Sequence, residues 1–158
     1  MSSSMTLSQF LAAGRVTERV TAAPILGVIT APDREFSGVR YQAPDGYVVR
    51  ELRGAKMRTL AGLYDEFAAA FQFPYYFGEN KDAFDECLRD LDDFVGRGDG
   101  YVVVVRNGEQ LLADEPGQHD WFVSAMRDGA DYWAKRDTVY RVVLQGESRL
   151  PNAVAVTL

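Results

Sequence analysis

The densest group of chemically active side chains in the sequence is a run of acids between residues 79 and 93. Seven carboxylates and two bases give this stretch a net charge of −5, in a chain whose formal net charge is −6. Carboxylates there can bind a cationic partner or simply keep a helix face hydrated, and charge runs usually do the latter. The acids are Glu79, Asp82, Asp85, Glu86, Asp90, Asp92 and Asp93, and the bases are Lys81 and Arg89.

Four aromatic residues immediately before the acids favour the binding interpretation. Phe73, Tyr75, Tyr76 and Phe77 crowd a short stretch that ends at Gly78. A loop cannot easily bury four rings, so we expect the phenylalanines to pack in the core and the tyrosines to face solvent or a partner. Tyrosine beside charge is typical of the residues that dominate protein interfaces.

The acids are predicted to lie on a helix that begins after Asn80 and runs to about residue 92 or 93. Asn80 has the side chain of a good N-cap. Apolar residues at three- and four-residue spacing form one stripe, so Cys87 is expected to be buried. The stripe is Phe84, Cys87, Leu88 and Leu91, and the opposite face carries Asp82, Asp85 and Glu86.

The elements that must position this helix alternate between strands and helices. Strands are predicted at residues 47–52, 101–106 and 138–144, and further helices at 59–72, with Thr59 as N-cap, and at about 120–135. The order strand, helix, helix, strand, helix, strand indicates parallel pairing through right-handed crossovers. The fold class is therefore α/β, with a small parallel sheet of three core strands, to which edge strands can be added, flanked by helices.

Three segments divide the chain. Residues 1–46 form an N-terminal extension that can add a strand or a hairpin: 24–30 is strand-like, 31–38 is a loop, and 39–42 pairs with 47–52 through the turn at 43–46. Residues 47–145 form the main domain. Residues 146–158 are a C-terminal tail, and 152–158 can add an edge strand.

Composition narrows the class of protein. The negative charge repels nucleic acid and anionic lipid, so a basic protein is the expected partner, with no direct nucleic acid contact. Cys87 is the single cysteine, which excludes an internal disulfide. The sequence has no signal-peptide pattern and no apolar run of about 18 residues. We therefore expect a cytoplasmic protein that does not span a membrane.

Enzyme and metal sites are weakly supported. His119 is the only histidine and follows a Pro-Gly turn, so it is expected at the surface or at a helix start. No nucleophile or oxyanion-hole pattern accompanies it, Cys87 or Ser124. The acids between residues 90 and 99 lack the spacing of a calcium loop. The expectation is no catalytic residue, no metal and no cofactor.

The stretch PYYFGENKDAFDECL at residues 74–88 resembles the central motif of the barstar family. The matching positions include Pro74, Tyr76, Gly78, Asn80, Asp82, Ala83, Cys87 and Leu88, and the resemblance extends over residues 47–145. It implies a proteinaceous inhibitor, not an enzyme, whose acidic helix and preceding Tyr/Gly loop block the basic active site of a guanyl-type ribonuclease. The implied partner is a small, basic, secreted ribonuclease. The implied partner-binding residues are Tyr76, Gly78, Asn80, Lys81, Asp82, Asp85 and Glu86.

The sequence departs from the family pattern at three of these positions. Glu86 stands where barstar has Asp, Asp85 replaces an aromatic residue, and Lys81 replaces an apolar one. A further acid from the helix before the last strand contributes in the family, and both Asp128 and Asp131 are candidates here. The departures keep an alternative open: an immunity or regulatory binding module of the same fold whose basic partner is not a ribonuclease.

Overall fold

A six-stranded parallel sheet forms the centre of the molecule. The computed structural model describes residues 4–12, 23–148 and 150–158. All strand pairs are parallel, and the strands follow the spatial order β1-β6-β2-β5-β4-β3. The strands are β1 (Ser4–Thr6), β2 (Leu26–Ile29), β3 (Tyr47–Arg53), β4 (Gly100–Arg106), β5 (Val139–Gln145) and β6 (Val154–Thr157).

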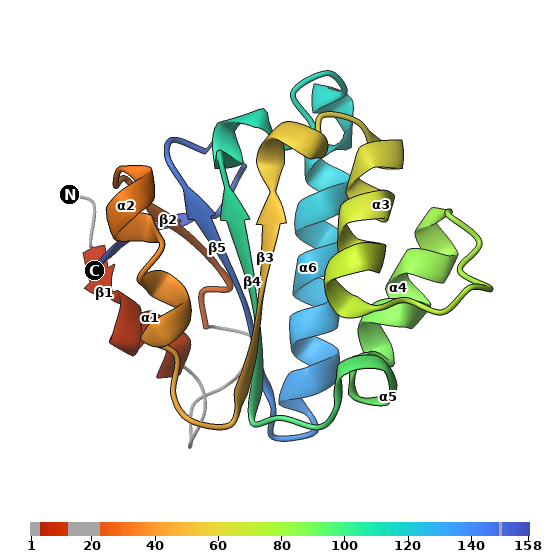
Figure 1. Cartoon of the computed structure of the whole chain (residues 1–158), viewed down its shortest axis with the longest axis horizontal. Coiled ribbons are helices and arrows are strands. Elements are labelled where there is room, and N and C mark those ends of the chain that lie inside the picture. Colours follow the sequence, from red (N-terminus) through yellow and green to blue (C-terminus); the bar gives the residue numbers. More distant parts are fainter. Residues whose placement is uncertain (1–3, 13–22, 149) are drawn as a thin grey trace.

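Helices cover both faces of the sheet, so the molecule has three layers. Figure 1 shows α3, α4, α5 and α6 on one face and α1 and α2 on the other. The first layer holds α3 (Leu60–Phe71), α4 (Lys81–Arg89), α5 (Leu91–Val95) and α6 (His119–Ala134). The second layer holds α1 (Leu7–Ala12) and α2 (Asp33–Phe36). The connections contain the 3-10 helices η2 (Val39–Tyr41), η3 (Gly54–Lys56), η4 (Gly108–Gln110) and η5 (Pro116–Gln118).

Each face of the sheet has its own hydrophobic core. Side chains from β3, β4 and β5 alternate between the two faces, so neighbouring valines of β4 belong to different cores. Val103 and Val105 pack under α3, α4 and α6, whereas Val102 and Val104 pack under the N-terminal helices. A β-branched run buried on both faces is what the sequence of residues 101–106 predicts, and all six strand positions from 100 to 105 are buried.

The predicted order of elements between residues 47 and 145 is confirmed, as is the α/β parallel fold class. Helix α3 begins after Thr59, whose side chain accepts a hydrogen bond from the Gly62 N–H at 3.2 Å. Helix α6 and strands β3, β4 and β5 lie within a residue or so of their predicted bounds. The sheet, however, has six strands where three core strands were expected.

The predicted hairpin between residues 39–42 and 47–52 is wrong. Residues 39–41 form η2, and among the described strands β3 pairs only with β4, in parallel. The turn signal does produce a turn, because the Tyr47 N–H donates to the Pro44 carbonyl at 3.2 Å. Val39 is buried in the second core.

Three further predictions need correction. Residues 33–36 form the short helix α2 inside a predicted loop, because Phe36 is buried in the second core. Helix α4 ends at Arg89, and the chain turns there so that Phe94 of α5 packs on Phe73, with ring centroids 5.9 Å apart. The C-terminal strand β6 is not an edge strand, because β1 pairs with its outer side.

The two ends of the chain meet in the sheet. Strand β6 lies between β1 and β2, and Gly27 of β2 leaves room for the side chains that cross there. A Cβ atom at Gly27 would lie 2.7 Å from Val156 and 3.0 Å from Phe10. A larger residue would therefore push the N-terminal helix and the C-terminal strand away from the sheet.

Candidate functional site: the acidic helix and its tyrosine loop

Asn80 organises the start of the acidic helix α4. Its side-chain Oδ1 accepts a hydrogen bond from the Ala83 N–H at 2.8 Å, and its Nδ2 donates to the Gly78 carbonyl at 3.3 Å. A Cβ atom at Gly78 would lie 3.0 Å from that Nδ2, so a side chain there would crowd the cap. Sequence predicts the cap, and the structure confirms it. Asn80 and Gly78 thus fix the angle at which the loop enters the helix.

The aromatic loop divides as the sequence predicts. Phe73 and Phe77 are partly buried against the main core, and Phe77 makes an edge contact with Tyr64 at 5.8 Å between ring centroids. Tyr75 is fully exposed and Tyr76 is 69% exposed, although their rings touch each other at 5.7 Å. Two exposed tyrosines beside two partly buried phenylalanines give a projecting surface whose base is packed against the core. Tyr75 was not among the predicted contact residues, although its position in the crowded aromatic loop indicated that it would be exposed.

Two carboxylates of α4 are open to solvent. Asp82 and Glu86 are exposed, one helical turn apart on the same face. No salt bridge engages either of them within the described part of the chain. Asp82 lies in the first turn, where the helix dipole stabilises a negative charge. Both acids are therefore available to a cation that approaches from outside.

Asp85 lies deeper than its neighbours. It is half-buried, and its Oδ1 atom is shielded from solvent without a hydrogen-bond partner in the part of the chain that the structure describes. Burial raises the pKa of this carboxyl group, and the negative charges of Asp128 and Asp82 raise it further, while Arg89 acts in the opposite direction. An unpaired, partly desolvated carboxylate next to another acid is costly to keep charged. A bound cation would remove that cost.

Helix α6 brings Asp128 to the acidic helix. The two helices are joined by a 2.8 Å hydrogen bond from the Trp133 indole N–H to the Leu88 carbonyl. Gly129 faces Leu88 at this contact, where a Cβ atom would make an ordinary van der Waals contact at 3.8 Å. Asp128 is exposed and acts electrostatically on Asp85, whereas no such interaction with Asp85 is found for the other candidate, the half-buried Asp131. Proximity thus favours Asp128 as the acid that extends the surface.

Lys81 points toward α6. Its ammonium group donates a 2.8 Å hydrogen bond to Gln118 and lies 5.2 Å from the centre of the Trp121 ring. The side chain is half-buried between the two helices. Lys81 is therefore occupied within the protein, unlike Asp82 and Glu86, and it fastens the first turn of α4 to the start of α6.

Cys87 and His119, the side chains that could support catalysis, have structural roles. Cys87 is buried, and burial, with the nearby acids Asp90 and Glu86, raises the pKa of its thiol to about 11. The His119 Nε2 atom is 3.1 Å from the Leu111 carbonyl at the start of α6, as expected for a helix-start residue. Among residues 4–12, 23–148 and 150–158, no group of three or more histidine, cysteine or acidic side chains is arranged to hold a metal ion.

The carboxyl ends of the central strands are filled by the protein's own loops. Ligands of open parallel sheets commonly bind at that edge. Here Gly54 lies so close to the carbonyls of Arg106 and Asn107 that a Cβ atom would fall within 2.5 Å of both. Gly108 packs similarly against Gln145.

No helix in the described residues is long and apolar enough to cross a membrane.

In a comparison with family models, residues 47–145 match the family described as Barstar (barnase inhibitor). The matched segment is well over half of the chain. The chain belongs to the barstar family. The match covers β3 to β5 and contains the whole acidic surface, whereas β1, β2, β6, α1 and α2 lie outside it. Members of the barstar family are inhibitors rather than enzymes. A search of the curated proteins found no match.

Proposed function

We propose that this protein inhibits a small, basic, guanyl-type ribonuclease by placing the acidic helix α4 and its tyrosine loop in the nuclease's active site. The observation that carries the proposal is the pair Asp82 and Glu86: two exposed carboxylates that no salt bridge engages among the described residues, on a capped helix of a barstar-family chain. Acids that served only solubility would not need a capped helix start next to two exposed tyrosines.

The chemistry of a ribonuclease active site complements this surface. Such a site aligns arginine, lysine and protonated histidine side chains around the scissile phosphate. The carboxylates of Asp82 and Glu86 would take the place of phosphate oxygens, and Tyr76 would pack on the rim of the cleft. Tyr75, Gly78 and Asp85 lie where they would contact the partner around these central groups. Opposite fields would also accelerate association, an effect well known for the barnase and barstar pair of this family.

Asn80 and Lys81 support this surface from behind. Both were expected to touch the partner, and both side chains are already engaged within the protein. Their proposed contribution is to hold the helix start in place, so that fewer degrees of freedom are lost on binding. We also propose that Asp128 adds a carboxylate beside Asp85 at the edge of the contact. The proposed location is the cytoplasm, where an inhibitor would protect the cell.

Cleavage of a fluorescent RNA by a small guanyl-specific ribonuclease tests the function directly. Increasing amounts of this protein should reduce the cleavage rate linearly and abolish it at one inhibitor per nuclease, because a plugged active site admits no substrate. Unchanged cleavage at a large excess of the protein, across several such nucleases, would remove the ribonuclease proposal. Tight binding to a basic toxin without loss of RNA cleavage would instead identify the alternative, a module for a different basic partner.

A further inference from the structure

The outer edge of strand β3 is open along the middle of the strand. β3 is the last strand in the sheet, and among the described strands it pairs only with β4. In a parallel pair, alternate residues direct both main-chain groups to the neighbouring strand. The N–H groups of Tyr47 and Arg53 bond elsewhere, to the Pro44 carbonyl and the Glu66 carboxylate. Residues 47, 49, 51 and 53 therefore face outward.

Both ends of this edge are closed, and only its centre is open. The turn at Pro44 covers the start of the strand, and Glu66 covers its end through hydrogen bonds to the main chain and the guanidinium of Arg53. The main-chain N–H and C=O groups of Val49 and Glu51 still point outward, and both residues are partly buried. The open stretch is long enough for an extended segment of about five residues.

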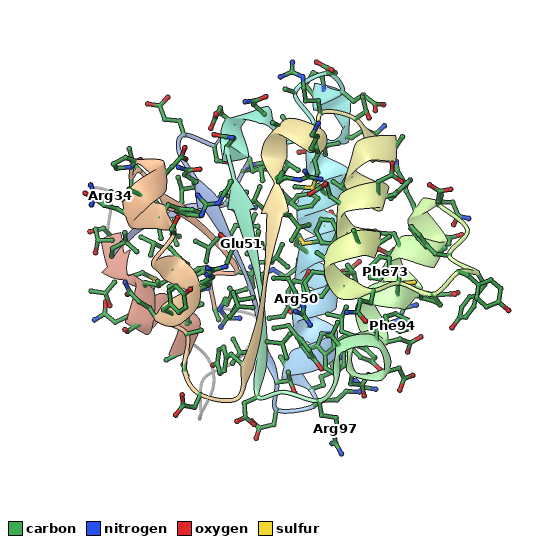
Figure 2. All side chains as sticks on the ribbon, in the orientation of Figure 1. Arg34, Arg50, Glu51, Phe73, Phe94 and Arg97 are labelled. Atoms are coloured by element: carbon green, nitrogen blue, oxygen red, sulfur yellow. The ribbon has the colours of Figure 1, made fainter. Side chains whose placement is uncertain are left out.

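The charged side chains around the open stretch carry a net positive charge. Figure 2 shows Arg50 on the side of β3 that faces α3 and α5, and Glu51 on the opposite side. Glu51 is already paired with Arg40 at 3.2 Å and Arg106 at 3.1 Å. Four arginines and two glutamates surround the strand, a net charge of +2 in a chain of −6; they are Arg40, Arg50, Arg53, Arg106, Glu51 and Glu66.

Arg50 is the unpaired charge of this group. Its Nε atom is shielded from solvent and has no hydrogen-bond partner, and no ion pair engages its guanidinium within the described residues. A shielded donor without a partner is unfavourable, and a carboxylate brought alongside the strand would satisfy it. The charge and the open main chain point to the same kind of ligand.

We propose that the β3 edge binds an extended acidic segment of a partner protein, which adds a strand to the sheet and directs a carboxylate to Arg50. Main-chain hydrogen bonds to Val49 and Glu51 hold the segment, and Arg50 selects for its charge. A second copy of this chain is a poor occupant. The antiparallel register that uses every open group pairs Val49 with Glu51 and sets Arg50 against Arg50, with Cα atoms only about 4.5 Å apart.

The test is an NMR titration of the isotope-labelled full chain with a heptapeptide of alternating valine and glutamate, and in parallel with its valine and lysine counterpart. The acidic peptide should shift the amide signals of Val49 and Glu51 and slow their hydrogen exchange by about tenfold or more. The lysine peptide should leave both signals unchanged. Absence of these shifts at millimolar acidic peptide, equal binding of the lysine peptide, or self-association through β3 would each overturn the proposal.

Two variants locate the binding. Val49→Pro removes an outward N–H that β4 does not use, so it should keep the ladder and weaken acidic-peptide binding by about tenfold or more. Val49→Thr keeps the N–H and is the matched control, with binding close to that of the native chain. Arg50→Glu should reverse the preference toward the lysine peptide, and it carries the test if the proline variant does not fold. Binding unaffected by Arg50→Glu contradicts the proposal.

Nuclease inhibition separates this inference from the proposed function. The β3 edge is not part of α4, so Val49→Pro and Arg50→Glu should inhibit a sensitive ribonuclease as the native chain does. Loss of peptide binding with inhibition intact supports two distinct surfaces. Loss of inhibition in both variants would show that the β3 edge belongs to the nuclease contact, and would overturn the assignment of a separate acidic partner.

Discussion

Cys87 illustrates how a single residue follows from its place on a helix. The spacing of Phe84, Cys87 and Leu88 puts the thiol on the buried face, and burial raises its pKa to about 11. At pH 8 only about one thiol in a thousand is then ionised. The native protein should react with a thiol-specific dye at least about a hundredfold more slowly than the urea-unfolded chain. Equal rates would show that the helix face is open.

Asp85 should oppose folding at neutral pH. Burial, followed by repulsion from Asp128, raises its pKa in the folded state. A carboxyl group with a raised folded pKa stabilises the protein while protonated, below its unfolded pKa, and that contribution is lost as the pH rises through the folded pKa. Asp85→Asn should therefore raise the thermal midpoint at pH 7.

The advantage of Asp85→Asn should vanish near about pH 3, where the native carboxyl group is protonated as well. The exposed Asp93 is a suitable control, because Asp93→Asn makes the same charge change without removing a partly buried group. Thermal melts of the three proteins at both pH values check this expectation. A lower midpoint for Asp85→Asn at pH 7 would mean that the carboxylate has a stabilising partner.

Residue types and spacing predict burial better than they predict partners. The buried stripe of α4 could be predicted, because helical periodicity decides which side of a helix faces the sheet. The exposed tyrosines could be predicted because a short loop cannot bury four rings. The engagement of Lys81 with Gln118 and Trp121 could not, because it depends on how α4 and α6 lie against each other. For the same reason, sequence could not choose between Asp128 and Asp131.

At the scale of elements, the stability of α4 depends on its N-cap, Asn80. Asn80→Ala removes the acceptor for the Ala83 N–H and should lower the free energy of unfolding by about 1 kcal/mol, within a range of 0.5–2 kcal/mol. Asn80→Asp keeps an acceptor and should lose much less. Urea titrations measure both. An alanine variant as stable as the native chain would show that the cap does not hold the helix start.

Elements between residues 47 and 145 could be predicted because each carries its own periodic pattern and stop signals. The misplaced hairpin shows the limit of such patterns. Residues 39–42 have the residue types of a strand, but Val39 is needed to fill the second core and the segment becomes η2. The position of β6 inside the sheet likewise depends on β1, which local sequence cannot reveal.

At the scale of the whole molecule, residues 1–46 should be essential for stability. Leu7, Phe10, Phe36 and Val39 cover Val102, Val104 and Val143 on the second face of the sheet. A chain that begins at residue 47 would expose those valines, and its free energy of unfolding should fall by roughly 5 kcal/mol or more. Denaturant unfolding and binding of a hydrophobic dye test this prediction. An unchanged midpoint would mark the first 46 residues as dispensable.

We propose that the exposed acids of α4 block the nuclease, and a comparison of Asp82→Asn with Asp93→Asn tests this most directly. Both variants remove one exposed acid, the first on α4 and the second on α5. Asp82→Asn should weaken inhibition of a sensitive ribonuclease by about 2–5 kcal/mol, a range known in part from the barstar family's own complex, because a buried cation of the nuclease loses its partner. Asp93→Asn should inhibit nearly as well as the native protein. Equal inhibition constants for the two variants would contradict the account.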